Sequence, residues 1–418
     1  EQPEKALSPD GIAVIGMAGQ FPQANDLDAY WQNLAQGKNC ISEIPPSRWD
    51  MSAIYHDGEG AITGKTNSKW LGMLDEYDMF EPLFFNISPA EAKSMDPQQR
   101  LFLQTCWQAI EDAGYRASGL SGSKCGVFAG CANNDYHLLS SQLQLGSQGF
   151  TGNAASILSA RISYFLNLQG PSIAIDTACS SSLVAINNAC NSLSQGESDL
   201  ALAGGVYVMP GPDMLIKTSQ AGMLSRDGQC YTFDQRANGF VPGEAVGVIL
   251  LKRLADAERD QDIIRGVIRG WGINQDGKTN GITAPKAESQ TKLQREVYNR
   301  YGIDPSDIQL IEAHGTGTPL GDPIEISGLK AAFAGYGQEQ AYCALGSVKS
   351  NIGHCLTAAG IAGVIKLLLA MKHQQLPPSI NFNCLNPHIN LDGSPFYVND
   401  KLQSWPQKNG KARLAAIS

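Results

Sequence analysis

The chain has 418 residues, of which 43% are hydrophobic and 17% charged, and its formal net charge is −9 at pH 7. This composition is typical of a soluble globular protein with an extensive core, and it excludes a disordered chain. The acidic balance and scattered basic residues argue against nucleic-acid binding, and we find neither an uninterrupted apolar run long enough to span a bilayer nor a signal peptide.

Residues 1–10 are polar and contain proline, which is typical of an interdomain linker. A strand is expected over 11–19, where an apolar run ends in a glycine turn. A helix over 26–38 follows, capped by Asp26 and stopped by Gly37.

A long amphipathic helix is predicted over 96–115, with an acidic start and an end at Gly114. The short apolar runs 124–132 and 172–178 have the composition of strands buried on both faces. Strands that alternate with helices indicate an α/β fold with largely parallel or mixed sheets.

The second half of the chain repeats the pattern of the first. In each half, a strand opens into a polar, glycine-bearing loop, and a later strand leads through small residues into an apolar helix; the matching segments are 125–135 with 308–318 and 172–196 with 342–375. We therefore expect two duplicated halves, with a seam near the charged, loop-like stretch 250–266. The expected division is an N-terminal half over 11–255 and a C-terminal half over 256–418.

The segment 270–281 contains the spacing of a phosphate-binding P-loop at Gly272, Gly277, Lys278 and Thr279. That motif works only where the Lys-Thr pair opens a helix whose amides hold the phosphates. Asn280, Gly281 and Pro285 follow at once, so no helix is expected there. The segment is interpreted as a polar turn.

Cys179 stands at a predicted transition from strand to helix, where free helix amides and the positive end of the helix dipole stabilise a thiolate. The chain has ten cysteines without a CxxC pair, which argues against a disulfide framework and a zinc site and suits a reducing cytoplasm. Most of them are expected to be small buried residues. Position alone leaves Cys179 open to both readings, a packing residue or a nucleophile.

Two of the six histidines, His314 and His354, also follow strand-like runs beside glycine turns. Active sites of α/β folds gather at the carboxyl ends of strands, so these residues and Cys179 are expected to converge. The other four histidines have the setting of loop, surface or helix-end positions. Lys349 is either a solvated lysine or the partner of a buried carboxylate, for which the candidates are Glu312, Asp322 and Glu325.

A cysteine with two histidines suits acyl transfer through a thioester. A cysteine protease needs one histidine and an orienting Asn or Asp, so the second histidine is informative. Two neutral imidazoles that donate to one carbonyl oxygen form an oxyanion hole for an enolate. This arrangement favours carbon–carbon bond formation.

The chain resembles β-ketoacyl synthase domains in three motifs, at 176–186, 312–325 and 349–371, and further at 11–24, 95–115 and 205–214. It is most similar to ketosynthases of bacterial modular type I polyketide synthases, including those whose acyltransferase acts in trans. The resemblance implies a thiolase-like αβαβα sandwich, a homodimer, acyl carrier protein partners and adjacent synthase domains, with no metal and no cofactor bound by the domain itself.

The resemblance also implies roles for individual residues. Cys179 would accept an acyl chain from the phosphopantetheine arm of a carrier protein, and His314 and His354 would assist decarboxylation of a malonyl-type thioester. Lys349 matches the motif lysine of the family, with a supporting electrostatic role. Thr316, Thr318 and Glu325 lie in the same motifs and are expected to support the site.

Two departures from the family pattern stand out. Ala245 occupies a position where a glycine is usual. The family continues after Ser418 into a glycine-rich turn that supplies one oxyanion-hole amide, and the sequence stops before it. A non-elongating acyl-transfer domain or a catalytically silent docking and dimerisation scaffold is therefore an alternative. A thiolase-type or decarboxylating relative is another, for which Cys355 beside His354 would be the second cysteine.

Overall fold

The computed structural model describes residues 11–418 except 59, 61, 143–147 and 338, so the expected linker at 1–10 lies outside the described residues. Its strands are β1 (Ile12–Gln20), β2 (Ser42–Glu43), β3 (Trp70–Leu71), β4 (Cys125–Gly130), β5 (Ser172–Ile175), β6 (Leu200–Tyr207), β7 (Ala245–Arg253), β8 (Gly266–Ile268), β9 (Ile308–Glu312), β10 (Cys343–Gly346), β11 (Gln375–Leu376), β12 (Phe396–Val398), β13 (Gln403–Ser404) and β14 (Leu414–Ile417).

Its α-helices are α1 (Leu27–Ala35), α2 (Met51–Ile54), α3 (Pro89–Ser94), α4 (Pro97–Asp112), α5 (Tyr136–Gln142), α6 (Gln148–Asn153), α7 (Ala155–Leu166), α8 (Ser181–Gln195), α9 (Asp213–Gln220), α10 (Leu254–Arg259), α11 (Ala287–Tyr301), α12 (Gly321–Phe333), α13 (Lys349–Ile352) and α14 (Ala359–His373). Three short 3-10 turns cover Ala117–Leu120, Pro305–Asp307 and Leu356–Ala358.

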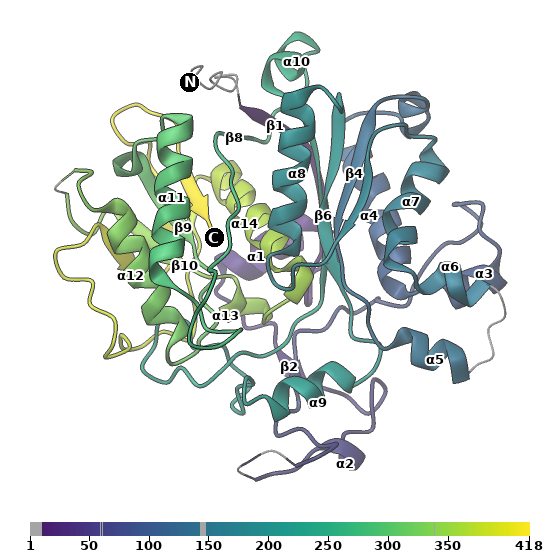
Figure 1. Ribbon diagram of the computed structural model, residues 1–418, viewed down its shortest axis with the longest axis horizontal. Coiled ribbons are helices and arrows are strands. Elements are labelled where there is room, and N and C mark those ends of the chain that lie inside the picture. The colour runs from purple at the N-terminus through teal and green to yellow at the C-terminus, as the bar shows by residue number, and fades with distance from the viewer. Residues whose placement is uncertain (1–10, 59, 61, 143–147, 338) are drawn as a thin grey trace.

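Five layers make up the fold. One sheet has the order β5-β4-β6-β7-β1-β8 and the other the order β12-β10-β9-β14. Helices α8 and α14 pack against each other between the sheets, while α4 and α7 cover the outer face of the first sheet and α11 and α12 flank the second (Figure 1). This arrangement confirms the expected αβαβα sandwich.

The positions of the two predicted helices agree with the structure because the residues that begin and end them could be recognised in the sequence. Asp26 accepts the Ala29 N–H at 2.7 Å at the start of α1, and Asp96 accepts the Gln98 N–H at 2.8 Å at the start of α4. Gly37 and Gly114 follow the two helices with φ of 62° and 78°, a left-handed conformation that glycine adopts without strain.

The first sheet differs from expectation at its edge. β5 pairs only with β4, so Ile173 remains 40% exposed, although the sequence predicted a strand buried on both faces. A terminal position in the sheet cannot be recognised from an apolar run alone. At the opposite edge, β8 pairs with β1, so this strand joins the first sheet although it follows residue 256 in the chain.

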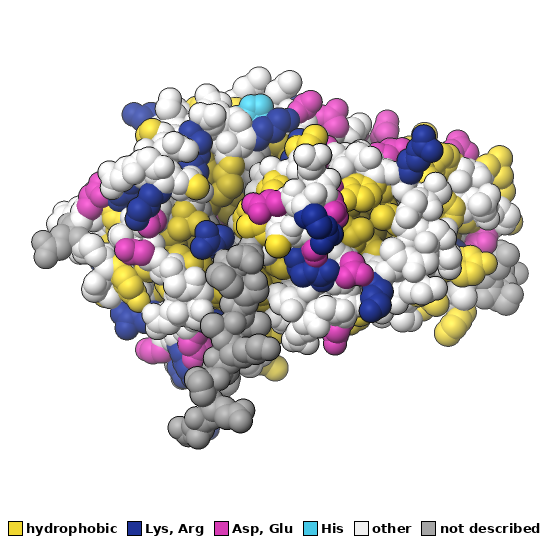
Figure 2. All heavy atoms as spheres, turned by 90° about the horizontal axis from the view of Figure 1, so that it is seen from above, with side chains coloured by type: hydrophobic (Ala, Val, Ile, Leu, Met, Phe, Trp, Pro, Cys, Tyr) yellow, Lys and Arg dark blue, Asp and Glu magenta, His cyan; other side chains and the backbone are white. Residues whose placement is uncertain are grey.

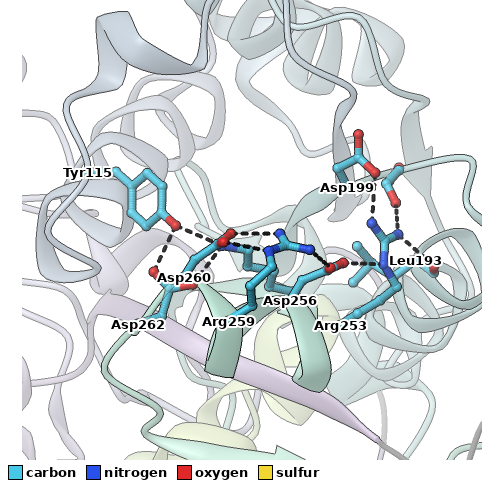
Figure 3. Close-up of polar contacts among 10 residues, drawn as sticks. Tyr115, Leu193, Asp199, Arg253, Asp256, Arg259, Asp260 and Asp262 are labelled. Carbon is cyan, nitrogen blue, oxygen red and sulfur yellow. Dashed lines mark hydrogen bonds and ion pairs between the residues drawn. The ribbon is translucent and has the colours of Figure 1, made fainter.

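The seam at 250–266 is more regular than the loop-like stretch that we expected, because it contains the end of β7 and all of α10. Figure 3 shows its ion pairs: Arg253 contacts Asp199 and Asp256, and Arg259 contacts Asp256 and Asp260. Basic and acidic side chains are likewise interspersed on the face seen in Figure 2, in agreement with the scattered charges of the sequence.

Two other sequence predictions concern helices. The P-loop-like segment opens no helix at Lys278, and α11 begins only at Ala287, so the interpretation as a turn is confirmed. The segment Leu356–His373, in contrast, is long and apolar enough to cross a membrane by length and composition, which the sequence analysis did not recognise. It is 72% buried inside the protein, as expected of a core helix.

Candidate active site

Cys179 lies in a tight turn between β5 and α8. Ala178 has a φ of 56°, a left-handed conformation that is costly for a residue with a Cβ. The turn is held by Asp176, which accepts the Ala178 N–H at 3.0 Å, and by Ser181, whose hydroxyl accepts the Thr177 N–H at 2.9 Å. The turn therefore fixes the thiol immediately before the first turn of α8.

Cys179 is partly exposed, which distinguishes it from eight buried cysteines: Cys40, Cys106, Cys125, Cys131, Cys190, Cys230, Cys343 and Cys355. Burial raises the pKa of each of these eight thiols, for example to about 11 at Cys40. The tenth, Cys384, is exposed.

His314 follows β9, and two carboxylates hold the loop that carries it. Glu325 accepts the N–H groups of His314 at 2.7 Å and Gly315 at 2.8 Å, and Asp322 accepts the Gly317 N–H at 3.1 Å. Both carboxylates come from α12 and are buried. Burial, followed by the charge of Glu325, raises the pKa of Asp322 to about 7.

His354 follows α13 and is 2% exposed. Its backbone N–H donates to Val241 at 2.7 Å, and its Nδ1 accepts the Leu356 N–H at 3.1 Å. Because a backbone N–H can only donate, Nδ1 carries no proton, and the neutral ring carries its proton on Nε2. Sequence reasoning did not identify this tautomer, which depends on the turn after the histidine.

The structure brings the three predicted residues together. The Sγ of Cys179 and one ring nitrogen of each of His314 and His354 lie within 4.8 Å of one another, and the two imidazole rings lie edge to face with centroids 5.5 Å apart. Cys179 and His314 line a cavity of ≈ 150 Å³, whose wall also includes Lys349 and Ser418.

Both histidines are held neutral at physiological pH. Burial, and then the positive charge of Lys349, lowers the pKa of His314 to about 3. Burial, Lys349 and His314 lower the pKa of His354 well below its ordinary value. Neutral imidazoles can donate to a developing oxyanion without carrying a charge themselves.

Lys349 is buried, with 4% of its surface exposed. Neither alternative from the sequence is correct, since this lysine is not solvated, and no carboxylate among the described residues lies within ion-pair distance of it. Glu312, one of the expected partners, is bound instead by Lys366 of α14 at 2.5 Å, a pair that the sequence analysis missed. The other two candidates, Asp322 and Glu325, hold backbone amides.

The remaining predicted residues lie beside the cavity rather than on its wall. The hydroxyls of Thr316 and Thr318 are 3.2 Å apart, and Thr318 accepts the Gly321 N–H at 3.2 Å near the start of α12. Ser418 donates its hydroxyl to Glu325 at 2.9 Å, so the end of the sequence lies at the site.

Cysteine and histidine are also zinc ligands, so the three groups must be tested as a metal site. A metal on Nε2 of His354 would require the remaining proton of a neutral ring on Nδ1. That proton would face the Leu356 N–H, which already donates to this nitrogen. The hydrogen bonding therefore favours a donor of protons or hydrogen bonds over a metal ligand.

Known proteins share this architecture over the whole chain. The N-terminal domain of the β-ketoacyl synthase family matches residues 10–257, and its C-terminal domain matches residues 265–383. Polyketide synthase PksL of Bacillus subtilis is 51% identical over 98% of this chain, and polyketide synthase ThaG of Burkholderia thailandensis is 47% identical over 99%. The chain spans only 9% and 7% of these two relatives.

Solved ketosynthase structures are equally similar. The ketosynthase from module 6 of the bacillaene synthase of Bacillus subtilis has 50% sequence identity and a TM-score of 0.91, covering 98% of this chain and 70% of that one. An oxazolomycin ketosynthase domain from Streptomyces albus has 41% identity and a TM-score of 0.93, covering 98% and 72%. The chain therefore belongs to the β-ketoacyl synthase family, as a ketosynthase domain of the polyketide synthase type with a thiolase-like fold.

Proposed function

We propose that this domain elongates a polyketide chain by decarboxylative Claisen condensation between an acyl group on Cys179 and a malonyl-type thioester on an acyl carrier protein. The observation that carries the proposal is the meeting of one accessible thiol and two neutral imidazoles beside a cavity. Thiolate chemistry on its own would need only one base.

The first half-reaction loads the enzyme. The Cys179 thiolate attacks the thioester carbonyl of the acyl chain, the acyl–sulfur bond to the phosphopantetheine arm breaks, and the arm leaves as a thiol after taking up a proton. The turn places Cys179 just before the N-terminus of α8, which is the positive end of the helix dipole.

The second half-reaction forms the carbon–carbon bond. His354 donates its Nε2–H to the thioester carbonyl of the malonyl group, with His314 as the second donor, so that loss of CO2 leaves a stabilised enolate. The enolate carbon attacks the Cys179 thioester, and the tetrahedral intermediate expels the thiolate. The product is a β-ketoacyl group, two carbons longer, on the carrier protein.

Lys349, Glu325, Thr316 and Thr318 support these steps. Burial lowers the pKa of both histidines and the charge of Lys349 lowers it further, so that both remain neutral donors. Glu325 positions His314 through its backbone, and the threonines shape the loop between His314 and α12. These are positioning roles, since only Cys179 and the two histidines would contact the reacting atoms.

The partners follow from the same proposal. The substrates arrive on phosphopantetheine, so the domain would need carrier proteins and neighbouring synthase domains but no cofactor of its own, in a cytoplasmic enzyme. The unpaired edge of β5, with Ile173 40% exposed, supports a homodimer in which two such edges meet. The proposal extends to an acyltransferase that acts in trans, as the sequence resemblance implied. The two halves would divide near residue 255.

Intact-mass analysis tests the proposal. The protein is incubated with an acyl-carrier thioester and then with a malonyl-carrier thioester. We expect an acyl adduct that is absent in Cys179→Ala, followed by a product two carbons longer on the carrier. An adduct that persists in Cys179→Ala would refute the nucleophile, and acylation without elongation would favour a transfer-only domain. A thiolase-type second cysteine is disfavoured, because Cys355 is 1% exposed.

A further inference from the structure

The ion pair between Glu312 and Lys366 is almost completely removed from solvent. Glu312 is 2% exposed and Lys366 1% exposed, and their Oε2 and Nζ atoms are 2.5 Å apart. Burying two charges costs several kcal/mol each, and an apolar pair of similar volume is often as stable. The fold alone therefore gives no reason for charges at these two positions.

The pair connects the segments that carry the catalytic residues. Glu312 ends β9, two residues before His314, and its Oε1 accepts the Val348 N–H at 2.6 Å. Val348 precedes Lys349, which begins the short helix that leads to His354. Lys366 lies on α14. One carboxylate thus joins the His314 strand, the Lys349 loop and the central helix.

Small residues make room for the pair. A Cβ on Gly363, which precedes Lys366 by almost one helical turn, would lie 2.9 Å from Cγ of Glu312, and a Cβ on Gly346 would lie 3.4 Å from Nζ of Lys366. Glu312 is also one of the residues that line the cavity, together with Lys349. Gly363 and Gly346 therefore leave the space that the Glu312 and Lys366 side chains occupy.

We infer that Lys366 is a positioning residue that neutralises Glu312 and thereby keeps Lys349 free to act on the histidines. Glu312 and Lys349 line the same cavity, and Lys349 has no carboxylate partner among the described residues. Without Lys366, the buried Glu312 carboxylate would lack a cation, and Lys349 would move toward it. The inference rests on the proposed function, since it concerns the condensation step.

Three variants and one control separate this role from a structural one. Lys366→Met leaves the Glu312 charge without its partner, Glu312→Gln removes the carboxylate, and Glu312→Gln with Lys366→Met removes both charges. Lys372→Met on the same helix is the matched control, because Lys372 is 49% exposed and its one ion pair among the described residues is with Asp28 at 3.7 Å. Each variant is measured for acylation of Cys179, for elongation of the acylated enzyme against pH, and for its melting temperature.

We expect Lys366→Met to slow elongation about 100-fold, since a displacement near 1 Å has that effect on a catalytic group. Acylation of Cys179 should change less than threefold, and the acid limb of elongation should shift to higher pH as the histidines lose the charge of Lys349. The double variant should recover at least tenfold over Lys366→Met, and Lys372→Met should match the unmodified protein.

Equal elongation by Lys366→Met and the double variant, or an unshifted acid limb, would overturn the inference. Parallel losses of acylation, elongation and melting temperature in all variants would also overturn it, in favour of a purely structural pair. If Lys366→Met does not fold, the comparison of Glu312→Gln with the double variant decides, because the inference requires both to keep the Lys349-dependent acid limb. Failure of the unmodified protein to elongate would instead contradict the proposed function.

Discussion

The imidazole of His354 has two roles: its Nδ1 accepts the Leu356 N–H, and its Nε2–H would donate to the substrate. Three substitutions test these roles independently. Asparagine places an acceptor near the position of Nδ1, and glutamine places an amide N–H near the position of Nε2. Alanine supplies neither. His354→Asn should therefore keep the structural contact, His354→Gln should keep the donor to substrate, and His354→Ala should lose both.

The magnitudes follow from the two contacts. Loss of one oxyanion donor costs about 2.7–4 kcal/mol, so elongation by His354→Asn and His354→Ala should fall about 10²–10³-fold. In His354→Ala the Leu356 N–H loses its acceptor, and an unpaired buried N–H costs about 1–3 kcal/mol. The free energy of unfolding of His354→Ala should therefore be lower than that of His354→Asn by about that amount. His354→Gln should elongate at least tenfold faster than His354→Asn.

The assay combines single-turnover elongation, started from enzyme already acylated on Cys179, with urea unfolding. Burial and Lys349 lower the pKa of His354, so the neutral donor persists on acidification, and elongation should show no acid limb at pH 6.5. An acid limb at that pH would contradict the neutral state of His354. A His354→Gln enzyme no faster than His354→Asn would refute the assignment of the proton to Nε2.

Three further predictions concern the supports of the site. Glu325→Gln can accept only one of the two N–H groups that Glu325 now accepts, so it should lower the free energy of unfolding by about 1–3 kcal/mol and slow elongation; an unchanged urea midpoint would contradict this. Ala178→Gly removes the strain of φ 56°, worth about 1–2 kcal/mol, against a backbone entropy cost of about 0.5–1 kcal/mol, so the melting temperature should stay level or rise, whereas Ala178→Val should lower it. The His314 pKa of about 3 makes the folded protein less stable as pH falls below 6.5, because the unfolded state takes up the proton first. The Asp322 pKa of about 7 makes the folded protein more stable as pH falls from 7 to 4, because the folded state takes up the proton first. Asp322→Asn should therefore steepen the acid loss of stability by about 1.4 kcal/mol per pH unit, and urea titrations of equal slope would exclude this.

Local features of the fold and site were predictable because their causes lie within a few residues. Asp26 and Asp96 cap helices that begin next to them, and Gly37 and Gly114 end those helices. The turn at Cys179 was equally local, since a β-branched run gives way there to small residues.

Features that depend on topology could not be predicted. The edge position of β5 follows from the strand order, and the pair of Glu312 with Lys366 joins residues on a strand and a helix that are distant in sequence. Lys349 was expected to be solvated or to bind a carboxylate, and its actual state depends on that distant pair. Sequence reasoning expected one cysteine and two histidines to lie together, as they do, but it could not assign partners across elements.

The surroundings of Cys179 likewise depend on its place in the fold. Eight of the ten thiols are surrounded by core, and burial raises their pKa, so these groups remain protonated and inert. Cys384 is exposed but lies outside the group formed by the two histidines. Cys179 alone, among the described cysteines, combines partial exposure with both imidazoles, because the segments that follow β5, β9 and α13 meet at the same point. Segments before residue 256 thus supply the thiol, and segments after it supply both imidazoles.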